Sequence, residues 1–273
     1  MALVAEEWLE SRRALKRKTQ ESDLFAWRVH IAPRFGKLPV ASITSAEVAH
    51  WAGGLATKGL APSTVCRYLA SLRSVLDYAV ADGRVSVNVA ASVKAPTSAK
   101  TRREGLFLTV QELDHLADEC RGTYGQLVKI LGLAGLRWGE MAGLRVRDLV
   151  RVPGRGLRLQ RAVLASSTDG SLYVGTLKGH RARTVPLVEE LVPVVDAWVA
   201  GKQPDNWLFH APKGGPLSER NWKHSVRWAE AVKAIRKPRL RVHDLRHTCA
   251  SVWLAPVPIP RWYNESSDTR RRP

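Results

Sequence analysis

The residues best suited to chemistry are His243 and Arg246, which lie in the stretch from Arg239 to Thr248. The apolar run that follows predicts that they begin a buried helix, where a spacing of three residues puts both side chains on one side. A guanidinium there can bind two oxygens of a phosphate, while an imidazole beside it can donate or accept a proton. The pattern predicts a phosphate-directed site, and its alternative is a basic helix end with a hydrogen-bonded histidine.

Two other segments favour the first interpretation. In residues 133–141, Arg137 follows the glycine that ends an apolar helix, and Glu140 is close enough to brace a neighbouring arginine or histidine. Residues 177–187 place Lys178 at the edge of a turn that we expect between two strands. Each feature also has an ordinary explanation, which is an exposed helical ion pair for Arg137 and Glu140 and a solvated charge for Lys178.

Three features follow one another along the chain: an arginine at a glycine-marked helix junction, a lysine at a hairpin, and the sequence His-Asp-Leu-Arg-His-Thr. In this order they resemble the tyrosine recombinase family of phage-type integrases. The resemblance runs from about residue 7 to residue 254, which is nearly the whole chain. It implies that Arg137 and Arg246 hold the two nonbridging oxygens of a scissile phosphate. It also implies that Lys178 protonates the leaving 5′-oxygen and that His243 assists the movement of protons.

After Leu254 the chain departs from the family pattern, which continues with a further helix, a Leu-Gly-His segment and a helix bearing the nucleophilic tyrosine. Residues 255–260 instead carry prolines at alternate positions, which forbid a helix, and no Leu-Gly-His occurs. Tyr263 is the only tyrosine after Arg246, so it is the candidate for the 3′-phosphotyrosyl link. We expect a chain that was truncated or shifted in reading frame after Leu254.

The resemblance also implies supporting residues and DNA contacts. Glu140 and His247 would not touch the phosphate but would contact and orient the residues that do. Four further arginines are candidates for DNA contact: Arg67, Arg73, Arg181 and Arg241. For Arg67 and Arg73 the alternative is a solvated helix face. Because a covalent tyrosyl intermediate conserves bond energy, neither a metal nor another cofactor is expected.

Composition indicates a nucleic-acid partner. The 273 residues include 43 Lys and Arg against 25 Asp and Glu, which gives a net charge of +18. Both the first 95 residues and the remainder are positive, so both can face duplex DNA, and binding should weaken as salt rises. No apolar run approaches the length of a membrane span and the N-terminus lacks the pattern of a signal peptide, so we expect a cytoplasmic protein. Three widely spaced cysteines argue against a disulfide framework and a zinc site.

Hydrophobic periodicity predicts two domains. Residues 1–95 carry only helical patterns, the clearest between Pro62 and Gly83, and they are similar to the core-binding domain of integrases. Further helices are expected at about 2–16 and 21–33 and after a capping box at Thr44 and Glu47. Residues 96–107 are polar and basic, and we expect a linker there.

Residues 108–254 are expected to form an incomplete catalytic domain, followed by an atypical tail rich in Pro and Arg at 255–273. A helix is expected at 218–235. Strands are expected at 156–164, 171–177 and 183–187, with the last two forming the hairpin that carries Lys178. The predicted fold is therefore mostly α with a small antiparallel β-sheet in the second domain, arranged as a two-domain DNA clamp.

Three functions remain open. The first is a site-specific recombinase that cuts and rejoins DNA, assembles as a tetramer on its site, and is impaired by its altered C-terminus. The second is a catalytically inactive DNA-binding remnant of a prophage or mobile-element integrase. The third is a basic DNA-binding regulator unrelated to recombination, which predicts that the four candidate catalytic residues do not converge in the folded structure.

Overall fold

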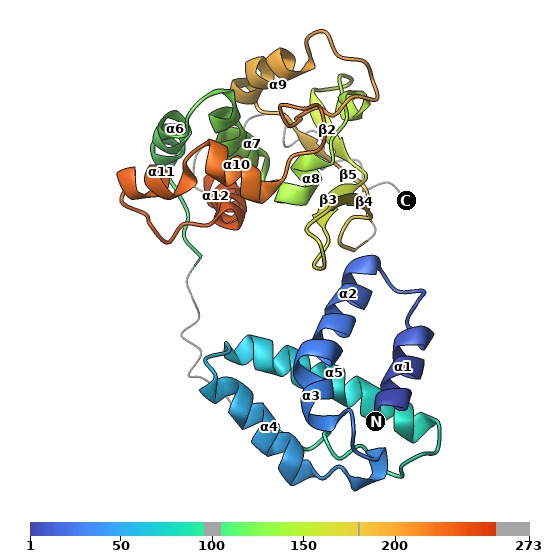
Figure 1. Ribbon diagram of the computed structural model, residues 1–273. Coiled ribbons are helices and arrows are strands. Elements are labelled where there is room, and N and C mark those ends of the chain that lie inside the picture. The colour runs from blue at the N-terminus through green and yellow to red at the C-terminus, as the bar shows by residue number, and fades with distance from the viewer. Residues whose placement is uncertain (96–104, 180, 255–273) are drawn as a thin grey trace, which may run out of the picture. The chain divides into compact units, whose positions relative to one another are not determined.

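The computed structural model describes residues 1–95, 105–179 and 181–254. The chain divides into two compact units, which consist of Met1–Arg103 with the turn Ser166–Gly170 and of Glu104–Ala165 with Ser171–Pro273 (Figure 1). The described residues are mostly helical, and their antiparallel strands are short. This confirms the predicted fold class, with two small sheets in place of one.

The first unit is made of helices. They are α1 (Ala2–Ser11), α2 (Arg17–Phe25), α3 (Ala32–Phe35), α4 (Ser45–Thr57) and α5 (Pro62–Ala81), with a π-helical turn at Ala26–Ile31 and a 3-10 turn at Val40–Ser42. The helix predicted between Pro62 and Gly83 is confirmed as α5. Its apolar stripe is buried at every expected position: Val65, Tyr68, Leu69, Leu72, Val75, Leu76 and Ala79.

Capping boxes begin two helices, and the one at Thr44 was predicted. At α4, Thr44 Oγ1 accepts a hydrogen bond from the Glu47 amide at 3.2 Å, and the Glu47 carboxylate accepts one from the Thr44 amide at 3.1 Å. Thr109 and Glu112 make the same exchange at the start of α6 (Val110–Glu119). Each box satisfies two amides that a helix end leaves unpaired, which is why the motif identifies the boundary reliably.

The first two helices differ from the prediction. The helix expected at 21–33 begins at Arg17 and is interrupted by the π-helical turn. Pro33, just past that turn, has no amide hydrogen to donate, which is consistent with a break in the α-helical ladder there. In and beside this turn Trp27 and Ile31 are buried, whereas Phe25 and Val29 are exposed.

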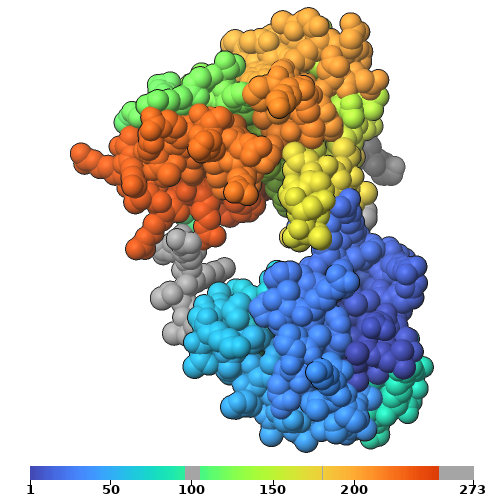
Figure 2. Space-filling view, in the orientation of Figure 1, coloured from blue at the N-terminus to red at the C-terminus, as the bar shows by residue number. Residues whose placement is uncertain are grey.

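The second unit contains helices and two small sheets. Its helices are α6, α7 (Leu127–Ala134), α8 (Trp138–Ala142), α9 (Val192–Val199), α10 (Glu219–Ser225), α11 (Trp228–Ala234) and α12 (Leu245–Leu254). Its strands are β1 (Leu149–Val150), β2 (Gly156–Leu159), β3 (Ala162–Ala165), β4 (Leu172–Gly175) and β5 (Arg183–Pro186). Short 3-10 turns lie at Thr123–Gln126, Val146–Asp148, Glu189–Leu191 and Val242–Asp244. Figure 2 shows the surface of β3 and β4 in yellow and that of α10 to α12 in orange and red.

The strands pair differently from the prediction. The single strand expected at 156–164 is two strands, since β2 pairs with β1 and β5 whereas β3 pairs with β4. The prediction of a hairpin between 171–177 and 183–187 is therefore wrong, because β4 and β5 belong to different sheets. Leu157, Leu159 and Val163 are buried as the alternation predicted. Alternation fixes which side chains face inward, but it does not choose the partner strand.

The helix predicted at 218–235 is also divided. Arg227 separates α10 from α11 and has a left-handed backbone conformation, with φ 53°, which an α-helix cannot continue through. The four apolar residues on which the prediction rested are nevertheless all buried: Trp222, Val226, Trp228 and Ile235.

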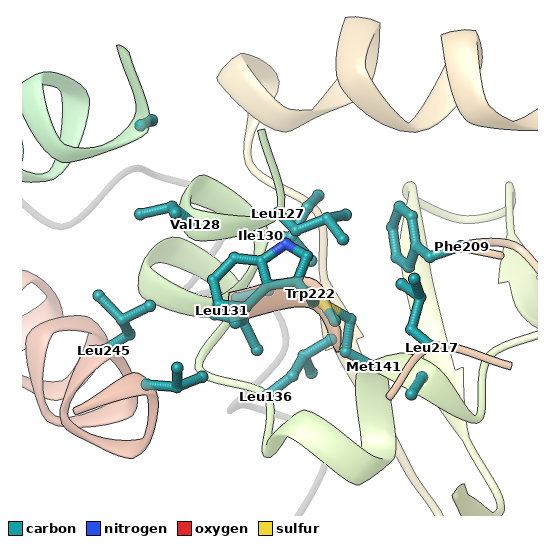
Figure 3. Packing of buried hydrophobic residues seen from close by; sticks show 14 of the residues in the cluster. Leu127, Val128, Ile130, Leu131, Leu136, Met141, Phe209, Leu217, Trp222 and Leu245 are labelled. Atoms are coloured by element: carbon teal, nitrogen blue, oxygen red, sulfur yellow. The ribbon is translucent and has the colours of Figure 1, made fainter. Parts of the chain in front are cut away.

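The core of the second unit is built around Trp222. Its indole lies among Leu127, Ile130, Leu131 and Met141, which come from α7 and α8 (Figure 3). The indole Nε1 donates to the Tyr124 carbonyl at 3.0 Å, so the one polar atom of the ring is satisfied. α12 packs against α7 on the same core. None of the described helices is both long enough and apolar enough to cross a membrane.

Candidate active site

The candidate site begins where α7 ends. Gly135 closes α7 in the left-handed conformation with φ 61°, and a Cβ at this position would lie 2.7 Å from Cys249 Sγ of α12. A Cβ at Gly139 would lie 2.5 Å from the Val163 carbonyl oxygen of β3. Glycine at these two positions therefore allows the junction between α7 and α8 to approach both α12 and β3 closely.

The side chain of Glu140 lies at the centre of the site and is only 2% exposed. Its carboxylate accepts a hydrogen bond from the Arg137 amide at 3.0 Å, which caps α8, and another from Arg137 Nη1 at 2.8 Å. The expected alternative, an exposed helical ion pair, is excluded by this burial. A buried carboxylate requires several partners, since an unpaired one is costly.

Arg183 of β5 supplies two of those partners. Its Nη1 and Nη2 donate to Glu140 Oε1 and Oε2 at 3.0 and 2.7 Å, which is a two-pronged ion pair. Arg183 was not among the residues predicted to form the site. The only signal in the sequence was an arginine on a predicted strand, five residues after Lys178. The alternation of apolar and polar residues along that strand does not reveal that Arg183 contacts Glu140.

Arg246 of α12 completes the group. Its Nη1 donates to the Gly135 carbonyl and lies 3.9 Å from Glu140 Oε2. Burial and the nearby charge of Arg137 lower the pKa of Arg246. We call Arg137, Arg183 and Arg246, gathered around Glu140, the arginine cluster.

The cluster is positively charged and accessible. Burial alone would raise the pKa of Glu140, but hydrogen bonds from Arg183 and Arg137 outweigh it and hold the pKa below its usual value. Glu140 is therefore ionised at neutral pH, and three guanidiniums face one carboxylate. The side chains of Arg137, Arg183 and Arg246 are 37%, 36% and 34% exposed, so an anion can reach them from solvent. Such a group suits the oxygens of a phosphate.

The histidines lie at the start of α12. His243 is in the preceding 3-10 turn, and its ring meets that of His247 edge to face at 5.7 Å, with both residues exposed. A Cβ at Gly105 would touch the His247 ring at 3.4 Å, so His247 packs against the first described residues of the second unit. Arg241 is exposed, and its backbone amide donates to the Asp244 carboxylate at 2.8 Å, which caps the turn.

Thr248 connects α12 to the entry of the second unit. It is fully buried, and its Oγ1 accepts a hydrogen bond from the Leu108 amide at 3.0 Å. The sequence analysis gave Thr248 no role. Its place in the His-Asp-Leu-Arg-His-Thr stretch was the only signal, and it does not indicate a partner 140 residues away.

The structure does not place every predicted site residue in the cluster. Lys178 and Arg181 are exposed in the connection between β4 and β5, which is not the predicted hairpin. Tyr263 lies outside the described residues, as does the linker predicted at 96–107 up to residue 104. No group of three His, Cys, Asp or Glu side chains arranged to hold a metal occurs among the residues that the structure describes.

The two arginines of α5 differ from each other. Arg67 is exposed and its guanidinium lies over the Tyr68 ring, 5.2 Å from the ring centre. Arg73 donates instead to the backbone carbonyls of Ala90 and Val93, so it holds the end of the first unit in place. These contacts give Arg73 a structural role, and its contact with DNA stays a prediction.

Comparison with known proteins gives a consistent picture. Residues 107–255 match the phage integrase family, and residues 1–96 match the phage integrase central domain. The chain is 31% identical over 234 residues to the integrase of Mycobacterium phage D29, covering 82% of this chain and 60% of that protein. It is 27% identical to the tyrosine recombinase XerC of Actinobacillus pleuropneumoniae serotype 7, covering 71% of this chain and 60% of that protein. The chain thus spans about three fifths of the length of these relatives.

A solved structure has the same fold. The Tn1549 transposon integrase in complex with transposon right end DNA superimposes with a TM-score of 0.77 at 19% identity, covering 92% of this chain and 85% of that one. The matched family covers more than half of the chain, including α7, α8, β5 and α12, which carry the arginine cluster. The chain therefore belongs to the phage integrase family of tyrosine recombinases.

Proposed function

We propose that this chain acts as a site-specific DNA recombinase of the tyrosine type. The observation that carries the proposal is that Arg137 and Arg246 both lie beside the buried carboxylate of Glu140. Arg246 comes from a distant part of the sequence, since the Gly135 carbonyl to which it donates is 111 residues earlier in the chain. An unrelated DNA-binding regulator gives no reason for these two arginines to converge. Family membership and the similarity to integrases support the same function.

In this mechanism, Arg137 and Arg246 bind the nonbridging oxygens of the scissile phosphate and stabilise the negative charge that grows there. A tyrosine oxygen attacks phosphorus, the bond to the 5′-oxygen breaks, and the 3′-phosphotyrosyl link forms. Lys178 gives a proton to the leaving 5′-oxygen, and His243 assists proton movement. The reverse attack by a 5′-hydroxyl of the other DNA releases the tyrosine, so no bond energy is lost.

Tyr263 is the proposed nucleophile, and it lies outside the described residues. The alternating prolines that precede it favour a second proposal, in which the chain binds its DNA site but does not cut it. Both proposals share duplex DNA as the partner, which the net charge of +18 supports. Arg67, Arg73, Arg181 and Arg241 are the proposed contacts with the DNA backbone, and assembly of a tetramer on DNA remains a prediction.

The test begins with DNA sequences selected from a random duplex library by binding to the full chain. A selected site is then nicked near its centre, so that cleavage releases a short strand and traps the covalent intermediate. We expect a protein–DNA adduct that survives denaturation in the wild type but not in Arg246→Lys or Tyr263→Phe. Arg155→Lys is the control, because Arg155 pairs with Asp196 at 2.7 Å and has no contact with the cluster.

Each outcome distinguishes the proposals. Selective binding without an adduct refutes strand transfer by this chain and supports the inactive DNA-binding protein. An adduct that persists in Tyr263→Phe refutes the assignment of the nucleophile. The absence of any selected sequence refutes both proposals, because each requires a specific DNA site.

A further inference from the structure

Glu140 has its full complement of hydrogen bonds. A carboxylate offers roughly four lone-pair positions to donors. Arg137 fills two of them, through its amide and Nη1, and Arg183 fills the other two, through Nη1 and Nη2. The carboxylate is 2% exposed, so water does not compete for these positions.

Arg246 makes none of these four hydrogen bonds to Glu140. Its Nη1 is 3.9 Å from Glu140 Oε2, beyond hydrogen-bond distance, and donates instead to the Gly135 carbonyl. A guanidinium has five N–H donors. Within the described part of the chain, the Gly135 carbonyl is the hydrogen-bond acceptor found for Arg246, so most of its donors remain available to an incoming anion.

We propose that Arg183 is a positioning residue that saturates Glu140 and so keeps Arg246 available to bind the phosphate. This inference rests on the proposed function. Arg183 does not need to touch the phosphate in this role, because it acts through the carboxylate. The role requires an arginine, since only a planar guanidinium fills two positions of a carboxylate at once, whereas a lysine ammonium is a point charge.

Removal of Arg183 shows why saturation matters. Two acceptor positions on a buried, ionised carboxylate would become vacant, which is costly. Arg137 already donates to the carboxylate, so the nearest cation not yet bonded to it is Arg246, and a movement of about 1 Å would bring its Nη1 within hydrogen-bond distance of Oε2. Glu140 would then hold Arg246 and compete with the phosphate for it.

A simpler role for Arg183 is to hold β5 against α8. That role predicts a loss of stability without a specific effect on Arg246. The two roles separate when Glu140 is neutralised together with the loss of Arg183. A glutamine has no negative charge with which to draw Arg246 inward, so phosphate binding should be partly restored. Under the purely structural role, the second substitution can only add to the damage.

The experiment uses the full chain with 15N-labelled arginine and inorganic phosphate as the probe. The side-chain Nε–H resonance of Arg246 is assigned by its disappearance in Arg246→Lys, and its shift with phosphate concentration gives a Kd. The variants are Arg183→Met, Arg183→Lys and the double variant Arg183→Met/Glu140→Gln. Arg161→Met is the matched control, because Arg161 pairs with another buried carboxylate, that of Asp148.

We expect the Kd to rise by about tenfold in Arg183→Met, to rise less in Arg183→Lys, and to fall back part of the way in the double variant. Arg161→Met should bind phosphate like the wild type. If Arg183→Met does not fold, Arg183→Lys carries the test, because it retains the charge and most of the packing.

An unchanged Kd in Arg183→Met, or in Arg183→Lys where only that variant folds, would overturn the inference and leave the proposed function intact. A double variant that binds phosphate no better than Arg183→Met would also overturn it. If the Arg246 resonance of the wild type does not respond to phosphate, both the inference and the proposed role of Arg246 in strand transfer fail.

Discussion

Glu140→Gln keeps the shape of the buried side chain at the start of α8 but replaces one accepting oxygen with a donating amide. Four hydrogen bonds reach the carboxylate from Arg137 and Arg183, and the substitution removes about two of them. A hydrogen bond to a charged group contributes about 1.5–3 kcal/mol. Because both arginine side chains are more than a third exposed, water recovers part of the loss. We expect the free energy of unfolding of the second unit to fall by about 3 kcal/mol.

This loss should depend on pH. Burial raises the pKa of Glu140, but the hydrogen bonds from Arg183 and Arg137 outweigh it and bring the folded-state pKa below the usual 4.5. A group with a lowered folded-state pKa contributes stability that is complete above its unfolded-state pKa and is lost as pH falls through its folded-state pKa. The difference in unfolding free energy between the wild type and Glu140→Gln should therefore be constant near pH 7 and shrink below pH 4.5.

Urea unfolding followed by near-UV circular dichroism measures the effect. Trp138 and Trp228 each lie against Trp222 with tilted rings, whose centres are 4.9 and 5.4 Å from that of Trp222, so their signal reports on packing around α8 and α10. A decrease of about 3 kcal/mol corresponds to roughly 6–12 °C in Tm for a unit of this size.

Asp148→Asn is the matched control. Asp148 is 3% exposed and accepts hydrogen bonds from the Arg145 amide at 2.8 Å and from Arg161, as Glu140 does from its own arginines. Both substitutions should destabilise the unit, but only Glu140→Gln should alter phosphate binding by Arg246. A Glu140→Gln protein within about 1 kcal/mol of the wild type at pH 7 would refute the assignment of Glu140 as the anchor of the cluster.

Three further results are expected. Thr248→Val leaves the buried Leu108 amide without its acceptor at 3.0 Å, so the unfolding free energy should fall by about 1–3 kcal/mol in the same urea titration, whereas Thr248→Ser should remain near the wild type. Gly135→Ala should lower Tm more than Gly170→Ala, because both positions have positive φ but only the first would bring a Cβ to 2.7 Å from Cys249 Sγ; Cys249→Ala should recover part of the difference. Duplex DNA binding should weaken steeply between about 50 and 200 mM salt, and an affinity that is insensitive to salt would contradict the inference drawn from the charge.

The sequence predicted those parts of the fold that depend on local chemistry. The capping box at Thr44 is confirmed, because it needs only two residues three apart. The apolar stripe of α5 is likewise confirmed. The π-helical turn at Ala26–Ile31 and the break at Arg227 were not predicted, since both are departures from a regular helix that the apolar spacing does not reveal.

The candidate site was predictable only where its contacts are local or its motif is distinctive. Spacing placed Glu140 within reach of Arg137, because three residues separate them at a helix start. The ordered motifs of the resemblance identified Arg246 as well. Arg183 could not be found in this way, because its contact with Glu140 depends on which strands pair, and the predicted hairpin made the wrong pairing.

The position of Glu140 ties the stability of the unit to the geometry of its site. The carboxylate caps α8 through the Arg137 amide and at the same time binds the guanidiniums of Arg137, just before α8, and of Arg183 in β5. A helix cap alone could be supplied by a serine or an aspartate, as it commonly is. Those shorter side chains would not reach the Arg183 fork in the same position. A longer carboxylate, buried and saturated, therefore allows one residue to end the α7–α8 junction and fix two arginines, and under our proposal it leaves Arg246 for the phosphate.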